Sequence, residues 1–73
     1  MIELDYWDER RGTTIARVSA RDPATIPVAG DAVYIPDAEQ AGIYVHVRVT
    51  SRHFYYSQEG AVVTIRLLCE VLQ

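Results

Sequence analysis

The sequence predicts an all-β fold, a small five-stranded antiparallel barrel in meander order with a proline-containing crossover. Apolar and polar residues alternate in several stretches, most clearly over residues 61–72, as they do in strands with one buried face. Turns that end in glycine separate two pairs of such stretches, at 10–12 and at 58–60. No stretch with helical periodicity is long enough to predict a helix.

Residues 2–6 predict the first strand. Their even positions are apolar and their odd positions are Glu3 and Asp5, so the even side chains are expected inside the barrel. The two carboxylates then point together to solvent. We interpret them as part of a solvated face and not as an acid–base pair.

The turn of the first hairpin is expected at Arg10-Arg11-Gly12, a three-residue loop that ends on a glycine with positive φ. Paired positions then sum to 22, which places Leu4 opposite Val18 inside the barrel. The same register makes Trp7 and Ile15 partners on the outer face.

Residues 21–31 interrupt the alternation. Pro23 and Pro27 disfavour helix and remove ladder donors, so we expect a connection that crosses the barrel, with one extended piece over 26–28. A Gly-Asp turn signal precedes a third strand over 32–35, which ends before the next proline.

The last thirty residues predict a long hairpin with arms over 44–56 and 61–72, joined by the loop Gln58-Glu59-Gly60. Paired positions sum to 118, which places Val49 opposite Cys69 on the inner side. The predicted core of this hairpin includes Val47, Val63, Ile65 and Leu67.

A four-residue loop over 57–60 is the alternative for this hairpin. It would shift the pairing by one residue and turn Phe54 and Tyr56 inward, and it would need a bulge near Ser51. The three-residue loop is preferred because it explains the whole arm without a bulge.

The remaining pairings complete the predicted barrel. The third strand is expected to join the long hairpin through Ile35 opposite Val45 and Tyr34 opposite His46. The first strand is expected to pair with the last, because closure removes exposed strand edges.

The length of the chain predicts one small domain over residues 1–73. Hydrophobic residues make up 49% of the chain, as in globular proteins and not in disordered ones. The single cysteine, Cys69, is expected to act as a small buried hydrophobe. No apolar run is long enough to span a membrane, and the N-terminus lacks a signal-peptide pattern, so a cytoplasmic location is expected.

Three segments of the chain resemble small SH3-like barrels, in which a Gly-Asp turn opens a strand and a hairpin follows. The segments are residues 26–35, 44–49 and 63–67, within a region of about 26–68. The chain is similar in particular to short uncharacterised proteins common in bacteria and their phages. The resemblance implies an SH3-like barrel of phage or prophage origin, and in that case a virion component, but it implies no activity.

No catalytic, cofactor or metal site is predicted. His46 and His53 are an odd number of residues apart, so a regular strand places them on opposite faces, with His53 facing inward. The usual spacing of zinc ligands is missing. Ser57 lies on no sharp strained turn with an oxyanion hole, so the chain is not expected to be an enzyme.

The predicted function is a non-enzymatic protein-interaction or structural module that associates with itself, most simply as a dimer. Aromatic and apolar side chains on the outer face, together with arginine, are typical of interface cores. Arg52 faces Arg66 in the predicted register, and a partner's carboxylate between them would relieve this repulsion. The predicted partner-binding residues are Trp7, Ile15, Tyr44, Arg52, Phe54, Tyr56, Val62, Arg66 and Leu68.

The alternative is a small nucleic-acid-binding barrel. Arg48, Arg52 and Arg66 are predicted on the outer face beside aromatic residues, as on surfaces that bind single strands. The formal net charge of −3 argues against a general affinity for nucleic acid. Glu70 opposite Arg48 would also neutralise part of this surface.

Overall fold

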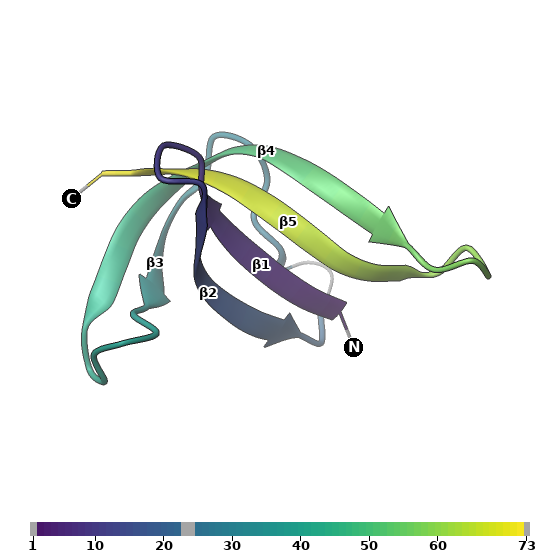
Figure 1. Cartoon of the computed structure of the whole chain (residues 1–73), viewed down its shortest axis with the longest axis horizontal. Coiled ribbons are helices and arrows are strands. Elements are labelled where there is room, and N and C mark those ends of the chain that lie inside the picture. Colours follow the sequence, from purple (N-terminus) through teal and green to yellow (C-terminus); the bar gives the residue numbers. More distant parts are fainter. Residues whose placement is uncertain (1, 23–24, 73) are drawn as a thin grey trace.

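Five strands make up the fold in the part of the chain that the computed structural model describes, residues 2–22 and 25–72. They are β1 (Ile2–Asp8), β2 (Thr13–Ala20), β3 (Ala32–Pro36), β4 (Tyr44–Tyr56) and β5 (Val62–Val71) (Figure 1). The prediction of an all-β, five-stranded domain is therefore confirmed. The described residues contain no helix of the length and apolar character needed to cross a membrane.

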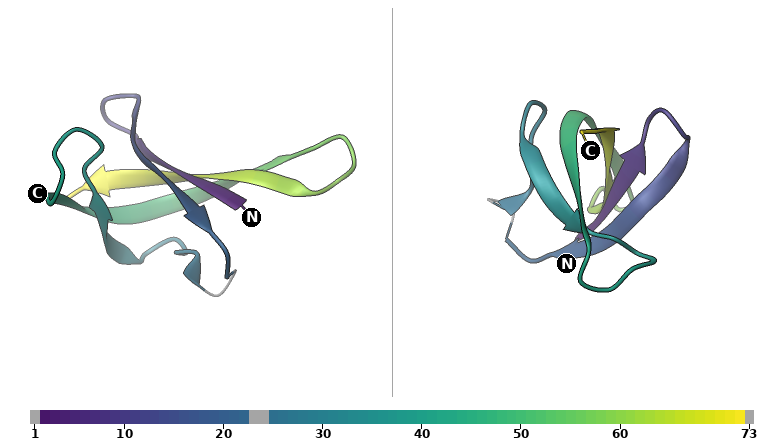
Figure 2. Two further views of the ribbon diagram at one scale, coloured as in Figure 1. Left: turned by 90° about the horizontal axis from the view of Figure 1, so that it is seen from below. Right: turned by 90° about the vertical axis from the view of Figure 1, so that its left-hand side faces the viewer.

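The strands form one curled sheet in the order β2-β1-β5-β4-β3, a nearly closed barrel whose free edges are β2 and β3 (Figure 2). All four predicted pairings occur, but the prediction of a wholly antiparallel barrel is wrong, because β1 and β5 run parallel. The physical reason is one of parity. When the chain reverses at each step through an odd number of strands, the first and the last point the same way, so they can pair only in parallel.

The core lies on the concave side of the sheet. Val47, Val49, Leu67 and Cys69 are fully buried. Three of the four predicted core residues of the long hairpin are confirmed, but Val63 is 47% exposed. Burial of Cys69 among apolar neighbours also confirms its prediction as a small hydrophobe.

The first hairpin follows the predicted register only from Ile2 to Tyr6, the part away from its turn. Leu4 pairs with Val18 as expected, but the register shifts between Tyr6 and Trp7, and Trp7 pairs with Thr14. Ile15, the predicted partner of Trp7, instead packs against the core.

The turn of this hairpin explains the shift. The Asp8 carboxylate accepts hydrogen bonds from the backbone N–H groups of Arg10 and Arg11 at 2.9 and 3.2 Å, which supports a loop of four residues closed by Asp8 and Thr13. Gly12 has the predicted positive φ of 70°, although the loop is longer than predicted. Aspartate at the start of a turn was a signal in the sequence for this arrangement.

The crossover and the third strand lie close to prediction. Tyr34 pairs with His46 and Ile35 with Val45, and β3 extends one residue further, through Pro36, which an edge strand tolerates. The crossover contains no strand at 26–28 among the described residues. Its Ile26 packs against the core, while Pro23, predicted to break the alternation, lies outside the described residues.

The long hairpin has the preferred three-residue turn, together with a bulge near Ser51 that only the alternative prediction required. Ser57 and Ala61 flank a three-residue loop, with the Ser57 N–H donating to the Ala61 carbonyl at 2.8 Å, and Gly60 has the predicted positive φ of 89°. Near the other end, Val49 pairs with Cys69 as predicted. Between these points the register is shifted by one residue, because irregularities lie between Val49 and Ser51 and between Tyr55 and Tyr56.

The shift changes which side chains share a face. Arg52 pairs with Leu67 and Phe54 with Ile65, so the predicted pair of Arg52 and Arg66 is wrong. The extra residue is Thr50, whose hydroxyl lies 2.7 Å from Glu9 Oε1 and 3.1 Å from the Leu68 carbonyl. This contact holds the bulge that the preferred prediction did not include.

Candidate functional site

The structure divides the nine predicted partner-binding residues among four places. Trp7, Arg66 and Leu68 stay on the outer face of the sheet, as predicted. The pairing of β1 with β5 keeps the alternation of the two strands in phase there, with Trp7 opposite Leu68. Ile15 packs against the core and Tyr44 lies at the far end of β4. The remaining four are found together on the concave side at the end of the long hairpin, where the two irregularities have turned them: Arg52, Phe54, Tyr56 and Val62.

This end of the hairpin is a projecting arm, defined here as residues 52–63. The β3 ladder along β4 ends at Arg48, and the β1 ladder along β5 begins at Glu3 opposite Thr64. The tip of the arm therefore consists of two strands with no third strand beside them among the described residues. Figure 1 shows it at the right, extending past the N-terminal end of β1.

Large apolar side chains are exposed on both faces of the arm. Phe54 is 43% exposed, Tyr55 44%, Tyr56 63% and Val63 47%. Phe54 and Tyr56 lie on the concave side, and Tyr55 on the convex side. Four large apolar residues without cover on one short ribbon are typical of a surface that a partner buries.

Tyr55 and Val63 were not among the predicted partner-binding residues. Three consecutive aromatic residues, Phe54 to Tyr56, cannot all face one side of a strand, so the sequence did carry a signal that both faces were apolar. Val63 had no such signal, because its exposure results from the irregularity opposite Tyr55 and Tyr56.

Charged groups lie at the two ends of the arm. The Arg52 guanidinium carbon is 5.2 Å from the centroid of the Phe54 ring, and Arg52 forms no ion pair among the described residues. Glu59 is exposed in the loop at the tip. The concave face of the arm thus carries a cation at its base and two aromatic rings beyond it, and the loop at the tip adds an anion.

A second cluster lies on the outer face, around Arg66. Its Nε donates to Asp5 Oδ2 at 3.1 Å, and its guanidinium carbon is 4.2 Å from the Trp7 ring centroid and 5.7 Å from that of Tyr55. The Thr14 hydroxyl donates to Asp5 Oδ1 at 2.9 Å. This cluster joins the arm, through Tyr55, to the first hairpin.

The same cluster corrects the prediction for the acidic pair of the first strand. Glu3 is exposed as predicted, but Asp5 is only 3% exposed. Arg66 is the neighbour of Asp5 on β5, and its long side chain covers the carboxylate while pairing with it. A buried carboxylate needs such partners, which the alternation pattern alone does not reveal.

The histidines do not share a site. His46 stacks on Tyr34 with ring centroids 4.3 Å apart, and His53 lies opposite Arg66. The prediction that His53 faces inward is wrong, because the bulge at Thr50 returns it to the outer face. In residues 2–22 and 25–72, no group of three or more histidine, cysteine or acidic side chains is arranged to hold a metal ion.

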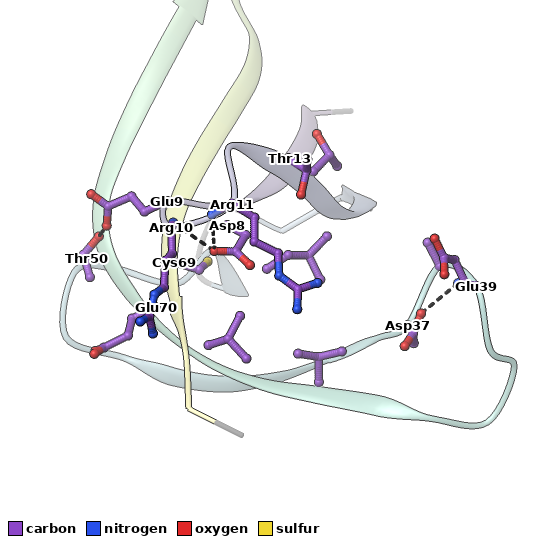
Figure 3. A pocket seen from close by; sticks show the side chains of 15 residues that line it. Asp8, Glu9, Arg10, Arg11, Thr13, Asp37, Glu39, Thr50, Cys69 and Glu70 are labelled. Carbon is purple, nitrogen blue, oxygen red and sulfur yellow. Dashed lines mark hydrogen bonds between the residues drawn. The ribbon is translucent and has the colours of Figure 1, made fainter.

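An open groove of about 1140 Å³ lies at the end of the barrel away from the arm (Figure 3). Ile15, Val45, Val71 and Cys69 are among its lining residues. Four of its five acidic lining residues stand on two sides, Asp37 and Glu39 on one and Glu9 and Glu70 on the other, with Asp8 between them. Asp37 and Glu9 already accept hydrogen bonds, from the Glu39 backbone N–H and the Thr50 hydroxyl.

The Cys69 thiol, which lines this groove, is held in its neutral form. Burial raises the pKa of Cys69 to about 11, a hydrogen bond from the Trp7 backbone partly offsets this, and the negative charges of Asp8 and Glu9 add to it. The thiol is therefore protonated at neutral pH and donates to the Leu67 carbonyl at 3.1 Å. Burial and the neighbouring Cys69 also raise the pKa of Tyr6.

Comparison of the chain with protein-family models, with curated proteins and with solved structures found no match.

Proposed function

We propose that this chain is a non-enzymatic protein-interaction module and that the arm, residues 52–63, is its contact element. The observation that carries the proposal is the exposure of large apolar side chains on both faces of the arm, between 43% and 63% for Phe54, Tyr55, Tyr56 and Val63. A barrel of this size has few ways to gain stability beyond its core, and association is one of them.

A two-stranded ribbon with no third strand beside it, as at the tip of the arm, is marginally stable in water. Covering its apolar side chains with a partner contributes about 25 cal/mol for each Å² removed from water, less the cost of association. Aromatic residues such as Phe54 and Tyr56 carry most of that area at a small loss of side-chain entropy.

We further infer that the barrel is SH3-like and of phage or prophage origin, with a place in the cytoplasm or in a virion. The inference rests on the resemblance of residues 26–68, and the consecutive pairing of β3, β4 and β5 is compatible with it. It adds no activity to the proposal.

Binding of nucleic acid stays the alternative. Two of the three arginines in that prediction have acidic neighbours, since Arg48 lies opposite Glu70 and Arg66 pairs with Asp5. Retardation of a labelled single strand at low salt, lost as salt is raised, would favour this alternative over the protein-interaction module.

Site-specific photo-crosslinking in expressing cells tests the proposed function. A photoreactive phenylalanine analogue replaces Tyr56 in one variant and Tyr44 in the matched control. The two tyrosines lie at opposite ends of β4 and are 63% and 64% exposed. We expect a covalent protein adduct from position 56 and little or none from position 44.

The mass of the adduct identifies the partner class. Twice the mass of the chain indicates a second copy, and any other mass indicates a different protein. Absence of an adduct at position 56, or equal yields at both positions, would contradict the arm as the contact element.

A further inference from the structure

The arm also carries a pattern that identifies its partner. We propose that the arm of one chain packs antiparallel against the arm of a second copy, around a two-fold axis, concave face to concave face. This inference rests on the proposed function, because it names the partner of the arm already described.

The arm is self-complementary in charge. From base to tip it presents Arg52, then Phe54 and Tyr56, and the loop that follows carries Glu59. Arg52 has no carboxylate partner within its own chain among the described residues, and its guanidinium lies over Phe54 and leans along the arm. The two ends of the arm therefore carry opposite charges, Arg52 at the base and Glu59 at the tip.

Direction follows from these charges. In an antiparallel arrangement Arg52 of each chain meets Glu59 of the other, and Phe54 meets Tyr56. In a parallel arrangement Arg52 meets its own copy and Glu59 meets its own copy, and like charges that face each other are unfavourable. The antiparallel arrangement is also the one that a two-fold axis across the arm produces.

The spacing is compatible with this register. Arg52 and Tyr56 are four residues apart on one strand, about 13 Å at roughly 3.3 Å per residue. The axis falls midway between Arg52 and Glu59, near position 55, which leaves Phe54 and Tyr56 on either side of it. The aromatic rings then form the centre of the contact, and the charge pairs form its rim, as in other interfaces.

The expected contact is small. An interface of standard size covers roughly 800 Å² on each partner, about a sixth of the 5113 Å² surface of this chain. The arm holds 12 of the 73 residues, a similar share, but only one of its faces is covered. The dimer is therefore expected at the small and reversible end of the range.

A charge-exchange experiment tests the inference. Sedimentation equilibrium is measured from about 1 μM to 1 mM for the wild type, Arg52→Glu, Glu59→Arg and an equimolar mixture of the two variants. Each variant alone brings two pairs of like charges together, so its dimer dissociation constant should rise roughly tenfold or more. In the mixture every pair is again opposite in sign, so a one-to-one heterodimer should form with near wild-type affinity.

The mixture is also the control for folding, since two misfolded variants would not recover association together. Unchanged affinity of either variant, or a mixture that stays monomeric, would overturn the antiparallel arrangement. A wild type that stays monomeric to about 1 mM would overturn self-association altogether. If position 56 then still forms an adduct of another mass, the proposed function stands and only this inference fails.

Discussion

Asp5 is a carboxylate that the fold buries almost completely, at 3% exposure, on the convex side of the sheet. It tolerates burial because Arg66 Nε and the Thr14 hydroxyl donate to its two oxygens at 3.1 and 2.9 Å. The Trp7 ring beneath the guanidinium fixes Arg66 in the pairing position. At the scale of single residues, these contacts connect the first hairpin to the long one.

Removing Arg66 should therefore destabilise the chain more than removing a comparable exposed arginine. Arg66→Met leaves Asp5 buried without its charge partner, at a loss of about 1–3 kcal/mol in the free energy of unfolding. Arg48→Met, opposite Glu70 on an exposed part of β4, should change it by less than about 0.5 kcal/mol. Urea unfolding measures both, and equal effects would show that the Asp5 pair contributes no more than a surface contact.

Cys69 makes the free energy of unfolding depend on pH in the alkaline range. Burial raises the pKa of the thiol from its ordinary 9.0 to about 11. Because the pKa of the thiol is higher in the folded state than in the unfolded state, its contribution to stability is fully present below the unfolded-state pKa. The contribution is lost as the pH rises from that value through the folded-state pKa. The free energy of unfolding should fall by about 2–3 kcal/mol between pH 9 and 11, and Tyr6, whose pKa is also raised, acts in the same direction.

The control for this effect is Cys69→Ala, measured by urea unfolding at pH 7, 9 and 11. The variant starts less stable but should lose less stability over the alkaline range, because only the Tyr6 contribution remains. Parallel pH profiles for variant and wild type would contradict a role for the thiol.

At the scale of elements, the irregularities in the long hairpin decide which residues are core. Ile65 and Val63 are both predicted inward by alternation, yet Ile65 is 2% exposed and Val63 47%. Ile65→Ala should lower the free energy of unfolding by about 2–5 kcal/mol. Val63→Ala should lower it by less than about 0.5 kcal/mol.

Denaturant unfolding of these two variants compares a deeply buried side chain with its neighbour two positions away. A loss below about 0.5 kcal/mol for Ile65→Ala, or similar losses for both variants, would show that the observed register is wrong. The comparison is direct because both side chains are β-branched residues of the same strand.

The sequence was sufficient for elements whose determinants are local. Alternation and the glycine turns predicted the strands, the pairing of Val49 with Cys69 and the positive φ of Gly60. The preferred prediction lacked the bulge at Thr50, which only the alternative included, near Ser51. The sequence could not decide between them, because the Thr50 hydroxyl contacts Glu9, 41 residues away in the chain. The burial of Asp5 depends likewise on Arg66, 61 residues away.

For the candidate site too, the sequence predicted what depends on local residue types and missed what depends on distant contacts. Phe54, Tyr56 and Arg52 were predicted as partner-binding residues from their types, and the structure gathers them on one face of the arm. The face itself was predicted wrongly, since the phase of the strand changes at a tertiary contact. Tyr44 was included although it lies at the other end of β4.

At the scale of the whole molecule, the odd number of strands makes the first and last parallel, and the sheet keeps two free edges at β2 and β3. The length of β4 and β5 exceeds what the other strands cover, so the molecule measures 38 × 22 × 22 Å, with the arm along its long axis. The shape itself thus leaves the arm projecting from the barrel.

Sedimentation equilibrium of the wild type, Phe54→Glu and Tyr55→Glu tests most directly whether the arm joins two copies through its concave face. The two residues are neighbours, 43% and 44% exposed, on opposite faces of the arm. We expect a reversible wild-type dimer, a monomer for Phe54→Glu, where a carboxylate enters the centre of the contact, and a dimer for Tyr55→Glu. A wild type that stays monomeric to about 1 mM, or equal association of the two variants, would contradict a dimer formed through the concave face of the arm.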